Sequence, residues 1–369
     1  MTATANASTA RQRTKGETAI RLVVLTIAAL LLFAPFLFQD VRSLEVAAKL
    51  CIFIVLVASY DLLIGYTGIV SFAHTMFFGF GAYGVAIVLK QWGAGWDAII
   101  VGSLAGIAVS LAVAVVIGLL SLRVKAIFFA MITLAAASVA LVLASQLSDF
   151  TGGEDGMTFR TPSLFKTATK LLVDEDNKVV RLFGVKLNGK LAAYYFVFLS
   201  CLTLFILMLR LVGSPLGTVL KSIRENEARA EAIGYRVVAY RTFVFCAAAV
   251  AASLAGSIYA VWLKYTGPDT TLSFSIMIDI LLMVVIGGMG TMWGAVIGAV
   301  LLVMAQYYLR DLMGVTAEAT SNLPLIPDIL NPDRWLFWLG IIFILLVYFF
   351  PAGIAGSIMK RGAPRATSE

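Results

Sequence analysis

Two ionisable side chains inside long apolar segments are the residues of this chain best suited to do chemistry. His74, the single histidine, lies in the segment SFAHTMFFGFGAYG with Ser71 and Thr75 beside it, and Asp279 lies in a second apolar segment. An ionisable group at membrane depth is a candidate for a substrate path, an ion path or a gate. Each residue has a plainer alternative, because His74 could fix the start of an interrupted helix and Asp279 could lie near the membrane surface.

Neither residue belongs to a recognisable catalytic or metal-binding set. No ligand stands at metal spacing from His74, no nucleophile is paired with it, and no apolar segment carries paired carboxylates. The segment GVKLNGK at 184–190 imitates the start of a phosphate-binding loop. Leu191 follows it, where a Ser or Thr hydroxyl must hold magnesium. We therefore expect a protein that is not an enzyme, with no metal, cofactor or nucleotide site of its own.

The composition indicates that membrane helices position these residues. Of the 369 residues, 60% are hydrophobic and 13% are charged, whereas soluble domains carry roughly twice that share of charge. Apolar runs of membrane-spanning length recur along the chain without strand-like alternation. We predict an all-α polytopic bundle of about ten transmembrane helices, with Cys51, Cys201 and Cys246 as small buried side chains. The predicted spans are 20–38, 44–64, 70–89, 97–121, 124–146, 191–212, 242–263, 275–289, 292–309 and 335–351. The span at 275–289 is short and contains Asp279, which fits a discontinuous or tilted helix.

The positions of the basic residues predict the orientation of the bundle. The formal net charge is +7, and basic residues gather in four places outside the spans. These are a polar N-terminal tail (1–20) expected to be disordered, the turn with Arg123 and Lys125, the loop 213–241, and a C-terminal tail (352–369). Because cytoplasmic loops of membrane proteins are enriched in Lys and Arg, we expect both termini and these segments inside, and we do not expect nucleic-acid binding. The membrane domain, 21–351, then carries one extracytoplasmic insertion, 148–190, in which VVRLFGVKLNG predicts a small β-hairpin.

The loop 213–241 is a charged island between two apolar segments. It reads GSPLGTVLKSIRENEARAEAIGYRVVAYR, and the spacing of Leu216, Leu220 and Ile223 predicts a helix that starts at Ser214-Pro215. Gly234 could end a short helix in a left-handed conformation. The spacing also allows two surface ion pairs, Lys221 with Glu225 and Arg224 with Glu227. The island is either a docking surface for a soluble partner or a solvated helix without one.

Glycine and small residues predict two further features. Irregular backbone, covered by protein or by a water-filled cavity, is expected around His74, from Gly65, Gly68, Gly79, Gly81 and Gly84. Close helix packing is expected where small residues recur four apart, at Gly102/Gly106, Ala252/Gly256 and Gly290/Gly294/Gly298. The stretch TGGEDGM at 151–157 fits either an outer gate or a glycine turn.

Four motifs in this order resemble the LivM-type permease subunits of branched-chain amino acid ABC importers. They are GYTGIVSFAHTMFFGFGAYG (65–84), the run from Thr133 to Met157, SPLGTVLKSIRENEARAEAIG (214–234), and GGMGTMWGAVIGA with the later DRWLFWLGIIFILLVYFFP. The resemblance covers roughly residues 45–351. It implies a multi-pass protein of the bacterial inner membrane, in contact with lipid, which works by alternating access.

The resemblance also implies partners and a role for the island. The expected partners are a LivH-like second permease, two ABC ATPase subunits and a periplasmic binding protein. The island would contain the coupling helix that seats on an ATPase, with the residues Arg224, Glu225, Asn226, Glu227, Glu231, Ala232 and Gly234. The wider importer pattern has a second Ala after Glu-Ala and three residues before Gly. Here Ile233 and Gly234 follow Glu231-Ala232 directly, so the register of this helix on the ATPase is open.

The substrate path and the substrate are less closely defined. Candidate path or gate residues are Ser71, His74, Thr75, Thr151, Gly152, Gly153, Asp155 and Asp279. Branched-chain or related amino acids are the expected cargo, and similar subunits serve importers of urea, amides and aromatic acids. An ion-coupled secondary transporter is the alternative from another class, and only Asp279 and His74 favour it.

Overall fold

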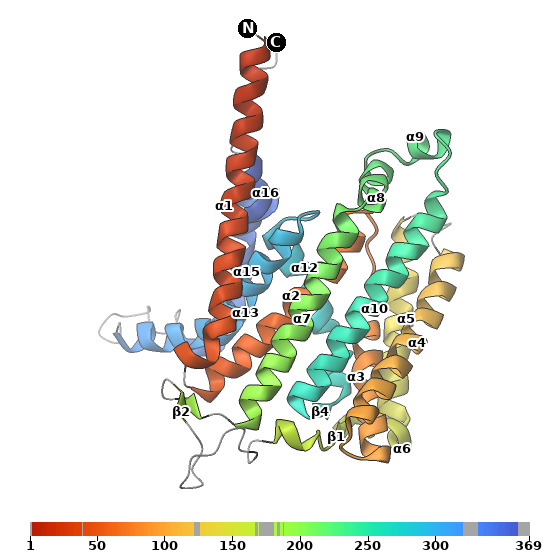
Figure 1. Ribbon diagram of the computed structural model, residues 1–369, viewed down its shortest axis with the longest axis vertical. Coiled ribbons are helices and arrows are strands. Elements are labelled where there is room, and N and C mark those ends of the chain that lie inside the picture. Colours follow the sequence, from red (N-terminus) through yellow and green to blue (C-terminus); the bar gives the residue numbers. More distant parts are fainter. Residues whose placement is uncertain are drawn as a thin grey trace. The chain divides into compact units, whose positions relative to one another are not determined.

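The computed structural model is helical apart from two pairs of very short strands (Figure 1). It describes residues 2–38, 40–121, 126–166, 169, 181–182, 185–186, 188–319 and 331–360. Within these ranges nine helices are long and apolar enough to cross a membrane, which confirms the prediction of an all-α polytopic bundle. The chain packs as two units, Leu31–Ile280 and Met1–Leu30 with Leu281–Glu369.

The larger unit contains most of the helices, and their bounds agree with the predicted spans to within a few residues. They are α2 (Val41–Ile64), α3 (His74–Trp92), α4 (Trp96–Ser121), α5 (Ala126–Gln146), α6 (Ser148–Thr151), α7 (Gly189–Gly213), α8 (Pro215–Glu225), α9 (Glu227–Ala232), α10 (Val237–Leu263) and α11 (Pro268–Thr271). The predicted turn with Arg123 and Lys125 lies outside the described residues.

Helix α3 lies against α4 and α10, and glycines allow this close approach. A Cβ atom on Gly81 would lie 1.8 Å from the carbonyl oxygen of Ser253, and one on Gly84 would lie 2.5 Å from that of Gly102. The prediction of irregular backbone is therefore right for residues 65–73, which are not helical, and wrong for Gly79, Gly81 and Gly84, which lie inside α3. Those glycines serve helix packing, which is their usual role in membrane helices.

Two strand pairs close the loops at one end of the larger unit. β2 (Arg181–Leu182) and β3 (Val185–Lys186) are antiparallel, which confirms the predicted hairpin. β1 (Met157–Thr158) pairs with β4 (Tyr265–Thr266), and the sequence did not predict this long-range pair. The short 3₁₀ helices η1 (Gly153–Asp155) and η2 (Ser163–Phe165) flank β1. Since α7 and α10 both run between these strands and α8–α9, the two loop regions lie at opposite ends of those helices (Figure 1).

The span predicted at 275–289 is one uninterrupted helix, so the predicted discontinuity does not lie within it, and the break in the chain precedes it. α11 ends at Thr271, and α12 (Phe274–Gly287) begins after a break at Leu272 and Ser273. The first part of α12 belongs to the larger unit and its last part to the smaller one.

The smaller unit contains the two ends of the chain. Besides parts of α1 (Thr2–Leu37) and α12, it holds α13 (Met292–Ala319), η3 (Pro332–Arg334), α15 (Trp335–Phe349) and α16 (Gly353–Lys360). The expected disorder of residues 1–20 is not found from Thr2 onward, because Ala, Arg and Gln favour continuation of the helix. Gly298 allows α13 to approach α12, since a Cβ there would lie 1.8 Å from the Met283 carbonyl oxygen, whereas Gly290 lies in the preceding turn at φ +82°.

Candidate functional site

Helix α8 begins where the sequence predicted and packs along one apolar face. Ser214 is the N-cap residue and Pro215 occupies the first turn, where its missing N–H costs no helical hydrogen bond. Leu220 and Ile223 are fully buried. Ile223 packs with Ala230 of α9 and Val237 of α10, so the loop has a small apolar core of its own. This core holds α8 and α9 in one defined arrangement.

Helix α9 is short and is capped at both ends. The Asn226 side chain accepts a hydrogen bond from the Arg229 amide at 2.9 Å, which satisfies one free N–H of the first turn. At the other end Gly234 has φ +96°, its amide donates to the Glu231 carbonyl at 2.9 Å, and the Tyr235 amide donates to the Ala230 carbonyl at 3.1 Å. This pattern is a Schellman C-cap and confirms the predicted left-handed helix end.

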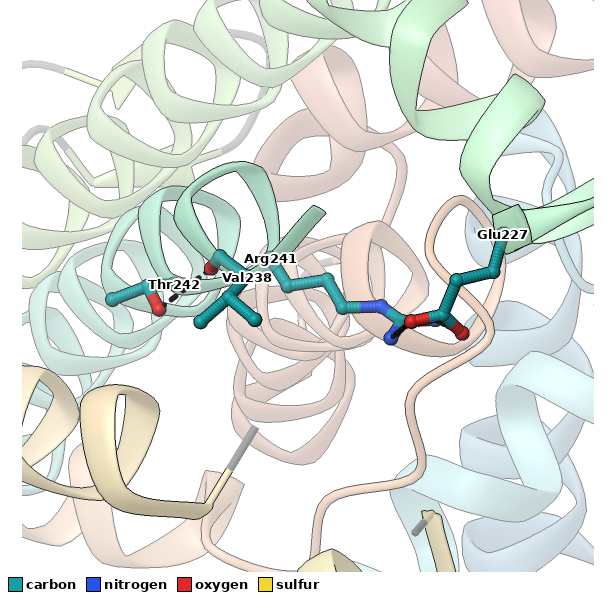
Figure 2. Close-up of polar contacts among 4 residues, drawn as sticks. All are labelled: Glu227, Val238, Arg241 and Thr242. Carbon is teal, nitrogen blue, oxygen red and sulfur yellow. Dashed lines mark hydrogen bonds and ion pairs between the residues drawn. The ribbon is translucent and has the colours of Figure 1, made fainter. Parts of the chain in front are cut away.

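An ion pair attaches α9 to α10. Figure 2 shows Arg241 reaching toward Glu227, and its two terminal nitrogens donate to the two carboxylate oxygens at 2.6 and 3.0 Å. One turn of α10 is visible in the same view, where the Thr242 hydroxyl donates to the Val238 carbonyl at 2.8 Å. The predicted pairing of Arg224 with Glu227 is therefore wrong, because a bidentate partner from α10 is available to Glu227 and gives better geometry.

The bidentate pair gives a stability prediction. In a double-mutant cycle of Glu227→Gln and Arg241→Gln, we expect a coupling of about 1 kcal/mol that weakens with salt, because the Arg241 side chain is only 17% exposed and the contact is two-fold. The matched control is Arg310 with Asp333, a single 3.3 Å contact between side chains that are 61% and 79% exposed. Thermal unfolding of the purified protein measures both cycles, and equal couplings for the two pairs would contradict the prediction.

The basic residues of α8 point away from the predicted pairing partners. The Arg224 guanidinium donates to the carbonyl of Gly65, the C-cap residue of α2. The Lys221 ammonium lies 5.4 Å from the centre of the Tyr66 ring. The predicted Lys221–Glu225 pair is replaced by this cation–π contact, because Tyr66 follows Gly65 directly and the same face of α8 covers both.

The outer face of the loop stays exposed. We call it the docking face and define it by Glu225, Glu231, Ala232, Ile233 and Gly234, all of which are exposed. Ile233 is 69% exposed, an unusual position for a large aliphatic side chain in a loop that otherwise buries its apolar residues. The docking face is thus polar at its edges with one apolar residue among them, a composition that suits a protein partner.

His74 is the first residue of α3 and is fully buried. Its Nε2 atom lies 2.7 Å from the Ser59 hydroxyl oxygen of α2, and the Ser59 hydroxyl in turn donates to the Leu56 carbonyl. Because that hydroxyl has a single proton, we assign Nε2–H as the donor to Ser59. The ring also lies edge-on to Tyr60, at 5.3 Å between centres. This geometry matches the plainer alternative, a hydrogen bond that fixes the start of an interrupted helix.

Loss of this bond should destabilise the protein. We expect Ser59→Ala to cost about 1–3 kcal/mol, because the buried imidazole N–H loses its acceptor. Ser138→Ala is the control, since the Ser138 hydroxyl is bonded only to the Leu134 carbonyl of its own helix and we expect a change within about 0.5 kcal/mol. A shift in the unfolding midpoint of Ser59→Ala no larger than that of Ser138→Ala would contradict this role.

The candidate path residues do not form one cluster. Ser71, His74 and Thr75 lie at the start of α3, whereas the last turns of α3 pack with Met157 and Phe159, next to the 151–155 segment. Gly152, Gly153 and Gly156 lie in or next to that segment and have φ values of +79°, +66° and +66°. Positive φ angles of this kind are typical of a turn built on glycine. Asp155 accepts a hydrogen bond at its carbonyl oxygen from the Tyr265 hydroxyl at 2.9 Å, which attaches the turn to β4.

Asp279 interacts electrostatically with Lys49 of α2, and both side chains are partly buried. Lys49 was not among the predicted path residues, and its ammonium also lies 5.2 Å from the centre of the Phe53 ring. Asp61, which is 1% exposed in the last turn of α2, was not among them either. Both lie inside a predicted span, so the rule that ionisable residues at membrane depth are functional candidates applied to them as well. Among the residues that the structure describes, no three His, Cys, Asp or Glu side chains gather as a metal site would require.

The fold and the loop define a multi-pass membrane protein with an ordered polar loop between two spans. The chain belongs to the family of permease components of branched-chain amino acid transport systems, whose model matches residues 43–349. It is 28% identical over 323 residues to the high-affinity branched-chain amino acid transport system permease protein LivM of Salmonella typhimurium, covering 85% of this chain and 74% of that protein. The corresponding protein of Escherichia coli is 25% identical over the same shares of the two chains.

A more distant relative is the probable branched-chain amino acid transport permease protein LivM of Methanocaldococcus jannaschii. It is 23% identical over 172 residues, which are 45% of this chain and 48% of that protein. No solved structure matches the chain. The resemblance to LivM-like permeases that the four motifs indicated is thereby confirmed.

Proposed function

We propose that this protein is a transmembrane subunit of an ATP-driven ABC importer for branched-chain or related amino acids. The observation that carries the proposal is the α8–α9 loop, which is ordered by two caps, an apolar core and an ion pair, while its docking face stays exposed. A solvated loop without a partner would need none of this order. Membership of the permease family supplies the transport context.

The docking face would seat on an ATPase subunit. Glu225, Glu231 and the apolar Ile233 form the contact, and the Gly234 cap fixes the end of α9 against it. A second, LivH-like permease and a second ATPase complete the membrane complex. The importer lies in the inner membrane. With α3 counted as a tenth span beside the nine, the number of crossings is even, and the α8–α9 loop and both chain termini lie in the cytoplasm. A periplasmic binding protein delivers the substrate at the β1–β4 end.

Transport would proceed by alternating access. Binding-protein docking and ATP binding change the distance between the ATPases, and the α8–α9 loops carry that movement into the bundle. The glycine turn with Thr151, Gly152, Gly153 and Asp155 is our candidate for the outer gate, since three positive φ angles let it rearrange. Asp279, with Lys49, is our candidate for a charged part of the path. Ser71, His74 and Thr75 act at the opposite end by positioning α3.

Uptake of radiolabelled leucine into proteoliposomes tests the proposal. The vesicles hold the complete complex with the binding protein outside, and we expect uptake that needs ATP inside and is insensitive to ionophores. Competition by unlabelled valine, urea, an aliphatic amide and benzoate identifies the cargo class. Uptake driven by an ion gradient without ATP would overturn the importer assignment and favour a secondary transporter.

A further inference from the structure

The segment between α2 and α3, residues 65–73, meets α8 at two points. We call this segment the α2–α3 turn. Gly65 ends α2, and the last carbonyl groups of a helix have no partner within it. The Arg224 guanidinium donates to the Gly65 carbonyl, so a cation sits where the helix dipole favours one. Lys221 lies over the ring of the next residue, Tyr66.

The Arg224 side chain also lies beside Gly68 of the turn. Gly68 has φ +73°, and a Cβ atom there would lie 3.5 Å from Cγ of Arg224. Lys221 and Arg224 are three residues apart and therefore share one face of α8. Both side chains contact the α2–α3 turn, although they remain partly open to solvent, whereas Glu231 and Ile233 of the docking face lie on and after α9.

Hydrogen bonds attach the α2–α3 turn to α2 and α5, and a further bond joins the start of α3 to α2. The Thr67 hydroxyl donates to the Leu63 carbonyl of α2 at 2.7 Å. The Phe72 amide donates to the Thr133 hydroxyl of α5 at 3.0 Å. His74 at the start of α3 is bonded to Ser59 of α2. The turn is therefore bonded to the end of α2 and to α5, next to the point where α3 begins.

The α8–α9 loop is thus attached to the bundle at two places. Glu227 ties α9 to α10 through Arg241, and Arg224 ties α8 to the α2–α3 turn. The first contact joins neighbouring segments of the chain, whereas the second spans 159 residues and reaches a different part of the bundle. These two attachments connect the α8–α9 loop to two different parts of the bundle.

We propose that Arg224, supported by Lys221, is a positioning residue that transmits movement of the α8–α9 loop to the α2–α3 turn. Its role is then internal to the permease, and the ATPase contact is made by the docking face. The inference rests on the proposed function, because it needs an ATPase to move the loop. It assigns Arg224 a different task from Glu231, although both lie in the same short loop.

The test compares ATP use with transport in the complete importer. In Arg224→Ala proteoliposomes we expect the ATPase subunits to co-purify as with wild type and the ATP hydrolysed per leucine imported to rise about fivefold or more, the lower range of usual coupling between sites. Arg224→Lys, which keeps one donor, should recover part of the wild-type ratio. Lys221→Ala should raise the ratio in the same direction, and it carries the test if Arg224→Ala does not fold.

Two variants serve as references. Arg210→Ala removes the same charged group from the exposed last turn of α7 and should keep the wild-type ratio. Glu231→Lys should lose the ATPase subunits. A wild-type ratio in both Arg224→Ala and Lys221→Ala would overturn the inference, and so would loss of the ATPase subunits from Arg224→Ala. Failure of the proposed function itself is a separate result, since wild-type protein would then co-purify no ATPase.

Discussion

A Gly234→Val permease is expected to reach the membrane in a folded form and to import no substrate above the background of cells without it. Gly234 has φ +96°, a region that a β-branched residue avoids at a cost of about 1–3 kcal/mol. Helix α9 has six residues and depends on the Gly234 cap for its last hydrogen bonds, so the strain should unwind this end of the helix. The docking face would then lose its shape. Radiolabelled leucine uptake in a strain lacking the native permease measures the loss.

The matched control for this prediction is Gly213→Val. Gly213 is the last residue of α7, at the other end of the same loop, and a Cβ atom added there has nothing within 4 Å. The same is true at Gly234, so the two substitutions differ in backbone conformation and not in available space. We expect near-normal uptake for Gly213→Val and normal amounts of both proteins in the membrane. Wild-type uptake by Gly234→Val would contradict the coupling role of α9.

A Gly81→Val permease is expected not to accumulate as a folded protein. The Cβ atom would lie 1.8 Å from the Ser253 carbonyl oxygen, and the obstacle is backbone of α10, which cannot rotate away as a side chain could. Separating α3 from α10 would open the packed centre of the larger unit, and we expect a cost of about 3 kcal/mol or more. Since folded proteins are stable by only about 5–15 kcal/mol, this is a large share of the total. Fluorescence-detected size-exclusion chromatography of detergent extracts measures the folded fraction.

The control for Gly81→Val comes from a glycine with open surroundings. Gly340 lies in α15, and a Cβ atom there has no neighbour within 4 Å. We expect Gly340→Ala to be neutral or to stabilise the helix by up to about 1 kcal/mol. Gly256→Ala should also lower the folded fraction, because its Cβ atom would lie 1.8 Å from the Phe78 carbonyl oxygen. A folded, monodisperse Gly81→Val protein would show that α3 and α10 do not pack in this way.

Local patterns in the sequence predicted much of the fold. Apolar runs gave most of the spanning helices to within a few residues, because in lipid a spanning segment must satisfy its backbone hydrogen bonds by itself. The exceptions are α1, which begins at Thr2 instead of residue 20, and α13, which ends at Ala319 instead of residue 309. Ser214-Pro215 and Gly234 marked helix ends through their own backbone preferences, and the hairpin at 181–186 followed from local alternation. Each of these features is determined by residues close together in the chain.

The contacts that define the α8–α9 loop could not be predicted in this way. Spacing alone predicted an ion pair between Arg224 and Glu227. In the structure Glu227 pairs with Arg241, and Arg224 donates a hydrogen bond to the Gly65 carbonyl, 159 residues away in the chain. Glycines 79, 81 and 84 looked like signs of irregular backbone, and their use in packing depends on which helix lies opposite. The β1–β4 pair joins residues more than a hundred positions apart and has no local signal.

Co-purification of the tagged protein in mild detergent, with mass spectrometry of everything that accompanies it, tests the central claim most directly. We expect a complex with ATPase subunits and a second permease, and loss of the ATPase subunits from the Glu231→Lys variant while the second permease stays bound. Recovery of the wild-type chain without any ATPase, from membranes in which it still supports leucine uptake, would contradict the account and leave the α8–α9 loop without its proposed partner.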